Sequence, residues 1–322
     1  MKVNYIVLSL SVVLIFLLQQ CTQRTITLSP LLGNWTLKAE LEGPARAAAV
    51  SFTIGNMAYL GTGLDVSNNA LNDFWKYDPS RNTWTQIASL PGKGRTEAVA
   101  FAVDSKGYVG TGVDAQSNFF RDFYEYNPTA NTWMRVADFG GSARRLAVAF
   151  TLYDAGFVGL GFDGSEKADL WRFNPSTNSW TQRKDFGDGT RVSAATFVIN
   201  NLAYVGAGSS LNKTHNDLWV YDSDQDSWAQ RRSIPDEVSN SSYSVGFAVN
   251  GIGYLITGTI GAGLNQVLAY RPEIDSWVQK GSFEGAARIK AVGFAVGSKG
   301  YISTGSTGTT RFDDLWAFDP GF

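Results

Sequence analysis

Two columns of opposite charge recur along the chain and are the residues best suited to do chemistry. Five arginines stand six positions before a repeated phenylalanine: Arg46, Arg95, Arg144, Arg191 and Arg288. Aspartates follow each of them 25 to 27 positions later: Asp73, Asp122, Asp169, Asp217 and Asp314. Guanidinium and carboxylate groups form bidentate pairs with each other, and where they are unpaired they bind ionic ligands or transfer protons.

One repeat lacks both charges. Ser241 stands in place of the arginine, and Gln266 stands in place of the aspartate. Because neither charge is present without the other, the pattern predicts that each arginine pairs with the aspartate of its own repeat. The alternative is that the arginines are partly free and bind an anionic ligand or a partner. The sequence leaves both interpretations open for these residues.

Other reactive groups are scarce. His215 is the only histidine, and its polar neighbours predict a solvated loop residue. We therefore expect no catalytic triad, no histidine-based metal centre and no cofactor. Asp65, Asp114 and Asp163 lie in polar segments, which are typical either of ordinary solvated loops or of sugar-binding loops.

A repeated structural unit must position these residues. Six tryptophans recur at intervals of 47 to 49 residues: Trp35, Trp84, Trp133, Trp180, Trp228 and Trp277. Each interval contains four runs rich in aromatic and β-branched residues, which in the second repeat cover 97–103, 107–111, 123–126 and 132–136. Four short strands in a unit of about 50 residues predict the blade of a β-propeller.

The ends of the chain predict the number of blades. The last repeat stops at Phe322 without a fourth strand, and the first tryptophan, Trp35, has no three strands before it. We therefore predict an all-β fold over 34–322. It is a six-bladed β-propeller of four-stranded antiparallel blades, in which the N-terminal strand completes the last blade. The arginines open the innermost strands, so we expect them to ring one mouth of the central channel, beside the long loops.

The repeat resembles that of the Kelch family across nearly the whole chain. The shared features are a hydrophobic strand, a glycine pair such as Gly61-Thr62-Gly63, and spaced aromatics that end in tryptophan. The units are similar to those of bacterial envelope Kelch lipoproteins. The resemblance implies a binding or scaffold module that recognises a protein segment or a glycan at the long-loop mouth. It also implies an alternative, because one periplasmic six-bladed Kelch family acts as a sialic-acid mutarotase. The scarcity of catalytic groups favours the module without enzymatic activity.

The first 21 residues differ in character from the repeats. After Lys2, an apolar run extends from Ile6 to Leu18. As a helix this run is about 20 Å long, against a hydrocarbon core of about 30 Å, so it is too short for an ordinary membrane span. We predict an export signal at 1–21, lipidation of Cys21 and a tether at 22–33, which would place the protein in the bacterial cell envelope, anchored to the outer membrane or in the periplasm. Gln20 departs from the small residue that normally precedes a lipidated cysteine, so the alternatives are a secreted protein that is cleaved elsewhere and an uncleaved anchor.

Charge and cysteine content exclude two further features. The net charge is −2, and lysine and arginine are spread along the chain, so we predict no nucleic-acid partner. A single cysteine excludes an intramolecular disulfide. The stability of the fold must therefore come from packing and from closure of the ring.

Overall fold

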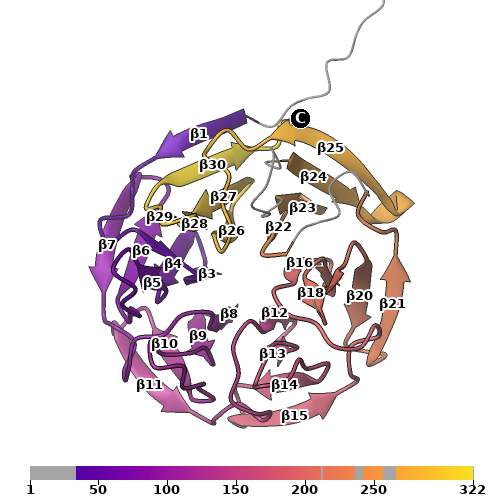
Figure 1. The fold of residues 1–322 in the computed structure, drawn as a ribbon, viewed down its shortest axis with the longest axis horizontal. Helices are drawn as coiled ribbons and strands as arrows, with labels where there is room; N and C mark the ends of the chain where they lie inside the picture. Colours follow the sequence, from indigo (N-terminus) through magenta and orange to yellow (C-terminus); the bar gives the residue numbers. More distant parts are fainter. Residues whose placement is uncertain (1–33, 212, 236–241, 257–265, 322) are drawn as a thin grey trace, which may run out of the picture. The chain divides into compact units, whose positions relative to one another are not determined.

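The computed structural model describes residues 34–211, 213–235, 242–256 and 266–321, all within the second of two compact units, Leu31–Phe322. Six sheets of four antiparallel strands form a ring around a central channel (Figure 1). This confirms the all-β fold class and the six-bladed propeller. Helical structure within the described ranges is limited to a 3-10 turn, η2, at Pro272–Ile274. None of the described residues belongs to a helix long and apolar enough to cross a membrane.

Blades 1 to 5 follow one another along the chain, each from the channel to the rim. Blade 1 consists of β3 (Val50–Ile54), β4 (Met57–Gly61), β6 (Phe74–Asp78) and β7 (Thr83–Ile87). Blade 2 consists of β8 (Val99–Val103), β9 (Lys106–Gly110), β10 (Phe123–Asn127) and β11 (Thr132–Val136). Blade 3 consists of β12 (Val148–Leu152), β13 (Ala155–Gly159), β14 (Leu170–Asn174) and β15 (Ser179–Arg183). Blade 4 consists of β16 (Ala195–Ile199), β17 (Leu202–Gly206), β20 (Leu218–Asp222) and β21 (Ser227–Arg231). Blade 5 consists of β22 (Val245–Val249), β23 (Ile252–Ile256), β24 (Gln266–Arg271) and β25 (Ser276–Ser282).

Blade 6 contains both ends of the propeller chain. Its inner strands are β26 (Val292–Val296), β27 (Lys299–Ser303) and β30 (Leu315–Asp319), and its outer strand is β1 (Asn34–Lys38). β1 pairs antiparallel with β30, from Asn34 opposite Asp319 to Lys38 opposite Leu315. The predicted closure by the N-terminal strand is therefore confirmed.

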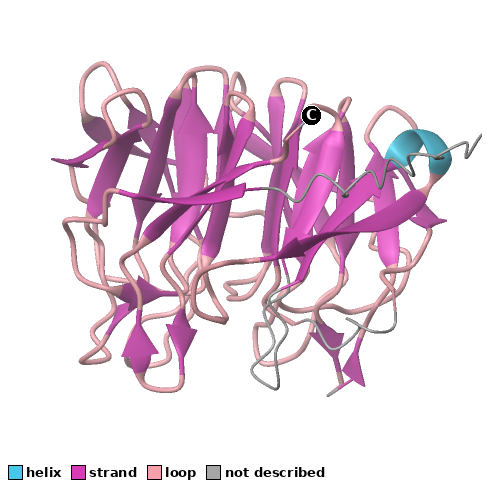
Figure 2. Ribbon diagram, turned by 90° about the horizontal axis from the view of Figure 1, so that it is seen from above, coloured by secondary structure: helices cyan, strands magenta, loops and turns pink. Residues whose placement is uncertain are grey.

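Short strands lie at one end of the ring, five of them in the long loops and one just before the first strand of blade 1 (Figure 2). They are β2 (Arg46–Ala47), β5 (Leu64–Asp65), β18 (Ser209–Ser210), β19 (Lys213–Thr214), β28 (Ser306–Thr307) and β29 (Thr310–Arg311). Since the second and third strands of each blade are joined at this end, the tight turns between first and second strands lie at the opposite end. We call the first end the mouth face and the second the turn face.

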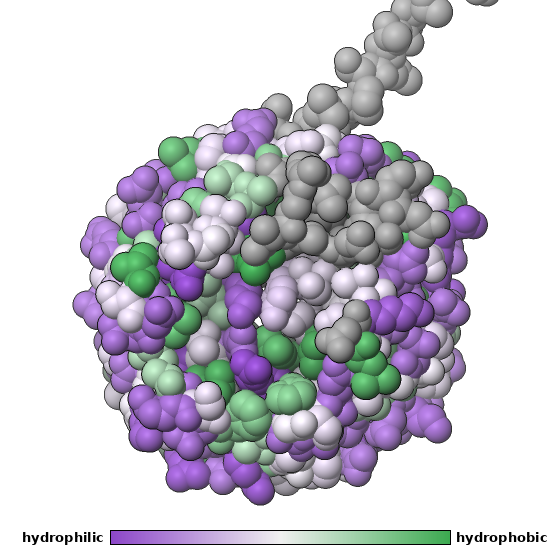
Figure 3. Space-filling view, in the orientation of Figure 1, coloured by the Kyte–Doolittle hydropathy of each residue, from purple (hydrophilic) through white to green (hydrophobic). Residues whose placement is uncertain are grey.

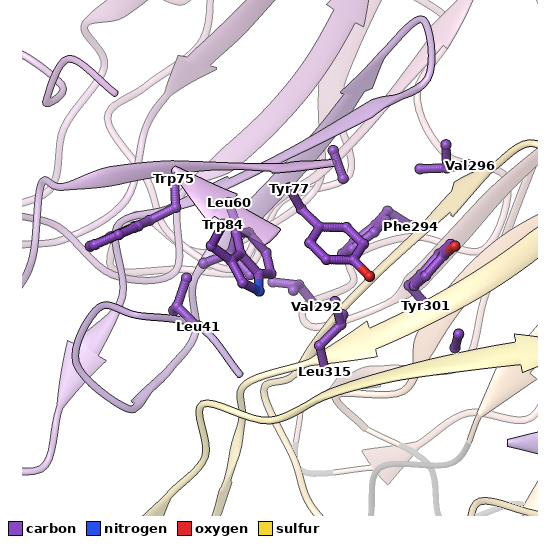
Figure 4. Packing of buried hydrophobic residues seen from close by; sticks show 12 residues of the cluster. Leu41, Leu60, Trp75, Tyr77, Trp84, Val292, Phe294, Val296, Tyr301 and Leu315 are labelled. Atoms are coloured by element: carbon purple, nitrogen blue, oxygen red, sulfur yellow. The ribbon is translucent and has the colours of Figure 1, made fainter. Parts of the chain in front are cut away.

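The core lies between neighbouring blades. Along the innermost strand of blade 2, Val99, Phe101 and Val103 are buried in alternation with small residues, as expected for side chains that point to opposite faces of a sheet. The Phe101 ring stacks on Tyr108 of the adjacent strand, with centroids 5.1 Å apart. Figure 4 shows the same packing where blade 1 meets blade 6.

Five of the six recurring tryptophans bind their blade to the one before it. Trp133 Nε1 donates to the carbonyl of Ala88 at 2.8 Å, and Asn131 Oδ1 accepts from the Ala88 N–H at 2.9 Å. The Asn131 side chain also accepts the Tyr126 hydroxyl at 2.9 Å. The same two bonds to the preceding blade recur at four other positions, Asn82 with Trp84, Asn178 with Trp180, Asp226 with Trp228, and Asp275 with Trp277. The polar residue two positions before each of these tryptophans is thus half of an inter-blade clamp.

Several predicted features lie outside the described residues. They are the export signal at 1–21 with Cys21, the tether at 22–33, and Ser241 of the repeat that lacks charges. The predicted strand boundaries of blade 2 differ by one residue in the second and third strands and by two in the first, which begins at Val99 and not at Glu97. Glu97 has a left-handed φ of 56°, which interrupts the extended chain.

Candidate functional site

The arginine and aspartate columns meet inside each blade. Arg95 Nη1 and Nη2 donate to the two carboxylate oxygens of Asp122 at 2.6 and 2.9 Å. The same bidentate geometry joins Arg46 to Asp73, Arg144 to Asp169, Arg191 to Asp217, and Arg288 to Asp314. The arginine side chains are 0 to 3% exposed and the aspartate side chains 11 to 20%. Each pair is therefore an almost fully buried link between the segments that precede the first and third strands of a blade.

In each of the five blades that carry the arginine, the residue before the recurring glycine that follows the second strand supplies a further acceptor: Thr62, Thr111, Leu160, Ala207 and Thr304. Arg95 Nη1 donates to the carbonyl of Thr111 at 3.1 Å, and Thr111 has a φ of 60°. The next residue, Gly112, has a φ of 95°, and a Cβ there would lie 2.8 Å from the Thr96 carbonyl oxygen. Glycine is required at this position for both reasons. The Gly-Xaa-Gly sequence thus turns a carbonyl toward the buried guanidinium.

Third-strand tryptophans complete the pair in four blades. Each stands two residues after the aspartate and donates its indole N–H to that carboxylate at 2.7 to 2.9 Å: Trp75, Trp171, Trp219 and Trp316. Blade 5 has Leu268 at this position, which is 2% exposed, and its β24 register shifts between Gln266 and Leu268. Leucine has no polar atom that needs a carboxylate. The arginine, aspartate and tryptophan form one hydrogen-bonded unit in the four blades that have all three. The repeat of blade 5 therefore lacks the whole unit rather than three unrelated residues.

Electrostatics keep these carboxyl groups ionised. Burial favours the neutral acid, but the hydrogen bonds and the positive charge of the arginine outweigh it and hold the pKa below its usual range at Asp73, Asp122, Asp169 and Asp217. The guanidinium of Arg95 also lies 4.4 Å from the centroid of the Phe120 ring. All five arginines are engaged inside the blades, so the prediction that they ring the channel mouth is wrong.

A different set of residues surrounds the mouth of the channel, and we call it the mouth ring. Its members stand two positions after the arginine column: Ala48, Glu97, Leu146, Ser193, Tyr243 and Lys290. All six have left-handed φ values, between 54° and 64°. The Glu97 N–H donates to the Ala48 carbonyl at 3.1 Å, and the Leu146 N–H donates to the Glu97 carbonyl at 3.1 Å. The left-handed residues thus bend the chain at the channel and link neighbouring blades by backbone hydrogen bonds. The arginine two residues before the bend lies away from the channel, and its side chain is buried in its own blade.

Glu97 connects three blades at the mouth. Lys290 Nζ of blade 6 lies 2.6 Å from its Oε1, and Arg145 Nη1 of blade 3 lies 3.0 Å from its Oε2. The Glu97 side chain is 6% exposed. The Arg145 guanidinium lies 5.9 and 5.7 Å from the ring centroids of Phe119 and Phe162. The charges of the mouth ring are thus concentrated on one side, over blades 6, 1, 2 and 3.

Two hollows meet at this network. A central one of about 160 Å³ is lined by the mouth ring and the small residues that follow it. A groove of about 410 Å³ lies over blades 6, 1 and 2 and is lined by Asn68, Asp114, Arg145, Lys290 and Arg311 among others. In the view of Figure 3, hydrophilic and hydrophobic residues lie side by side around the centre of the ring. Both hollows are lined by Glu97 and Lys290.

Arg311 differs from the other arginines at this end of the ring. Its Nη1 donates only to backbone carbonyls, those of Gly308 at 3.3 Å and Thr310 at 3.4 Å. Its Nε is buried and has no partner among the described residues. No carboxylate in the described part of the chain forms an ion pair with it. Arg311 therefore brings an uncompensated positive charge to the groove.

His215 is more enclosed than its polar neighbours predict. Its Nε2 lies 2.6 Å from the Ser210 hydroxyl and its Nδ1 lies 3.5 Å from Asp188. Burial and the charge of Arg191 lower its pKa, which favours the neutral imidazole. Asp188, His215 and Asp217 lie close enough together to hold a cation. Arg191, however, donates at 2.8 Å to both carboxylates and already supplies the positive charge there.

The acids of the long loops make local contacts. Asp65 accepts the N–H groups of Ser67 and Asn69. Asp114 does the same with Gln116 and Asn118, and its hydrogen bonds, first of all from the Asn118 side chain, lower its pKa to about 2. Asp163 likewise accepts the N–H of the residue two positions on. These contacts are the ordinary turn chemistry of aspartate, and they shape the loops around the groove.

Comparison with known proteins agrees with this fold. A family model described as the KLHDC2/KLHL20/DRC7 Kelch-repeats domain matches residues 33–191. Residues 33–191 thus match the Kelch-repeat family, and the chain folds as a six-bladed β-propeller. A solved structure of YjhT superposes with a TM-score of 0.73 over 86% of this chain and 96% of that one; at 16% identity the likeness shows the fold alone. No curated protein matches this chain.

Proposed function

We propose that this propeller is a binding module that holds a protein segment or a glycan at the mouth face. The observation that carries the proposal is the charge distribution of the groove. Each repeated arginine forms an ion pair with the aspartate of its own repeat. Arg311, in contrast, has no described carboxylate partner, and Lys290 shares the carboxylate of Glu97 with Arg145. The Arg311 guanidinium has no carboxylate partner among the described residues, so an oxygen atom of a ligand could accept a charge-assisted hydrogen bond from it.

The surroundings of the groove suit recognition better than catalysis. A mutarotase of sialic acid needs a group that is free to accept a proton. Glu97 is engaged in two ion pairs, and Asp114 is held by Asn118 and Lys93. Neither of these two acids is free to act as a base. This favours the binding module over the alternative of a periplasmic carbohydrate-processing enzyme.

Export and membrane attachment complete the proposal. The apolar run that ends shortly before Cys21 supports an exported protein that is attached to the cell envelope by a lipid on this cysteine. Metabolic labelling with a fatty acid, compared between the wild type and Cys21→Ser, tests this part separately. Loss of label in the variant is expected, and an unlabelled wild type would contradict it.

Arrays of peptides and glycans probed with the full chain test the binding proposal. We expect Arg311→Ala and Lys290→Ala to weaken binding of the ligands found by about tenfold or more each, because each removes a charge-assisted hydrogen bond. Arg135→Ala is the matched control, since this arginine lies on the outer strand β11 with its side chain 61% exposed. Ligands that bind equally well to all three variants and the wild type would place recognition elsewhere.

A further inference from the structure

A further cavity lies on the turn face, between blades 3 and 4. Its volume is about 430 Å³, within the range of about 300–1,000 Å³ that is typical of small-ligand sites. Blade 3 contributes Tyr153 and Asp154 from a tight turn and Arg172 and Arg183 from its outer strands. Blade 4 contributes Ser223 and Asp224 from the turn between β20 and β21. None of these residues lines the central hollow or the mouth groove, so the cavity is separate from both.

Tyr153 occupies a backbone position that disfavours it. It is the first residue of the turn between the first and second strands, where its φ is 53°. The five matched positions also have positive φ and hold residues that tolerate it: Gly55, Asp104, Asn200, Asn250 and Gly297. A left-handed conformation costs other residues roughly 1–2 kcal/mol. Packing does not offset this cost, because Tyr153 is 56% exposed.

Contacts across the cavity hold the tyrosine ring in place. The Tyr153 hydroxyl donates to Asp224 Oδ2 of the neighbouring blade at 3.0 Å. The ring therefore spans the two blades at the edge of the cavity, with an apolar face and a polar tip. A disfavoured, exposed aromatic residue that is fixed beside a cavity is typical of a binding site.

The charged groups of the cavity balance and are already paired. Arg172 Nη2 lies 3.2 Å from Asp154 Oδ1. Arg183 Nη2 donates to the Ser223 carbonyl at 3.1 Å, and its Nε lies 3.4 Å from Asp226 Oδ1, outside the cavity. With Asp224, the lining holds two arginines and two aspartates. A charged ligand gains little from a balanced lining and would have to separate one of these pairs. A hydroxyl group can instead accept from a spare guanidinium N–H and donate to a spare carboxylate lone pair without breaking either.

We propose that this turn-face cavity binds a neutral, hydroxyl-rich ligand, a segment of a glycan chain. A sugar ring has apolar C–H faces that suit the exposed face of Tyr153, and hydroxyl groups that suit the paired arginines and aspartates. Arg172 and Asp154 form the hydrogen bonds to the hydroxyl groups, and the sugar ring stacks on the side chain of Tyr153. The site is independent of the mouth groove and of its ligand.

An array of neutral hexose and N-acetylhexosamine oligosaccharides, with acidic peptides printed beside them, tests the proposal on the full chain. We expect binding of neutral oligosaccharides that falls by roughly tenfold or more in Tyr153→Asn and in Arg172→Ala. Lys76→Ala is the matched control, because Lys76 faces Tyr59 in blade 1 as Arg172 faces Phe157 in blade 3. Tyr153→Asn is expected to fold, since asparagine stands at this turn position in blades 4 and 5.

Three outcomes would overturn the assignment. They are an array without any bound neutral oligosaccharide, oligosaccharide binding that Tyr153→Asn leaves intact, and binding of the acidic peptides alone that is lost in Arg172→Ala. Arg311→Ala separates the two sites, because it should weaken ligands of the mouth groove and leave this one unchanged. The two proposals can therefore fail independently.

Discussion

Replacing Asp122 by alanine is expected to destabilise the propeller strongly. The substitution removes both carboxylate bonds of Arg95 and leaves its guanidinium, which is 0% exposed, with the Thr111 carbonyl as its remaining hydrogen-bond acceptor. Breaking a buried ion pair from one side costs about 3–5 kcal/mol, because the other charge stays buried without compensation. At about 2 °C per kcal/mol for a domain of this size, the melting temperature should fall by about 6–10 °C.

Two other substitutions provide a scale for the predicted cost of Asp122→Ala: one replaces the other partner of the pair, Arg95, and one removes an exposed ion pair. Arg95→Met should cost less, about 1–3 kcal/mol, because the side chain of Asp122 is 18% exposed and water can solvate it. Arg121→Met removes a pair with Asp138 whose charged atoms are 3.9 Å apart, and the Arg121 side chain is 55% exposed. For this exposed pair we expect roughly 0–1 kcal/mol.

Urea unfolding followed by tryptophan fluorescence, with calorimetry on the same samples, measures these differences. The slope of the unfolding transition must stay constant across the variants for the free energies to be compared. A double variant of Arg95→Met with Asp122→Ala should be less destabilised than the sum of the single variants, because the unpaired charge is gone. If Asp122→Ala costs no more than Arg121→Met, the Arg–Asp pairs do not brace the blades and the reasoning fails.

Two further predictions concern pH and the inter-blade clamp. The carboxyl groups of Asp73, Asp122, Asp169 and Asp217 have a lowered pKa, so the unfolded chain binds more protons than the folded one in acid. Their contribution to stability is complete well above the ordinary aspartate pKa of about 3.9, and it is lost as the pH falls through that value toward the lowered folded pKa. Urea midpoints should therefore drop steeply below about pH 4, and less steeply in Asp122→Asn; equal slopes would contradict this. Asn131→Ala removes acceptors for the Ala88 N–H and the Tyr126 hydroxyl and should cost about 1–3 kcal/mol by urea unfolding. Asn131→Asp keeps an acceptor of the kind found at Asp226 and should cost less, so the opposite order would refute the clamp.

Repetition made the fold and the ion pairs predictable from the sequence. Six copies in register revealed the strands, and the unmatched strand at each end revealed the closure that β1 and β30 form. The pairing within a blade followed from the repeat that lacks both charges. The structure adds the physical reason, since the third-strand tryptophan depends on the same carboxylate and is replaced together with it.

The mouth ring was not predictable, because its members share a backbone conformation and no chemistry. Ala48, Leu146 and Lys290 adopt the same left-handed φ, although none of these residue types is associated with it. The one sequence signal that could have identified the mouth ring is its constant spacing, since each member stands two residues after a position of the arginine column. The arginines were misplaced for the same reason, because an extended first strand would have carried them to the channel. His215 was misplaced because its polar neighbours in the sequence do not reveal the packing against Arg191.

The seam between β1 and β30 has a consequence for biosynthesis. The outer strand of blade 6 is made first, and its partner at Leu315–Asp319 is made last. At about 5–20 residues per second, β1 waits on the order of 15–60 s for the strand that will pair with it. Blades 1 to 5 have all their strands available earlier and can fold in order as they emerge. The ring itself closes only after β30 has been synthesised, so a chain cut before Leu315 would be left as an open arc with an unpaired edge.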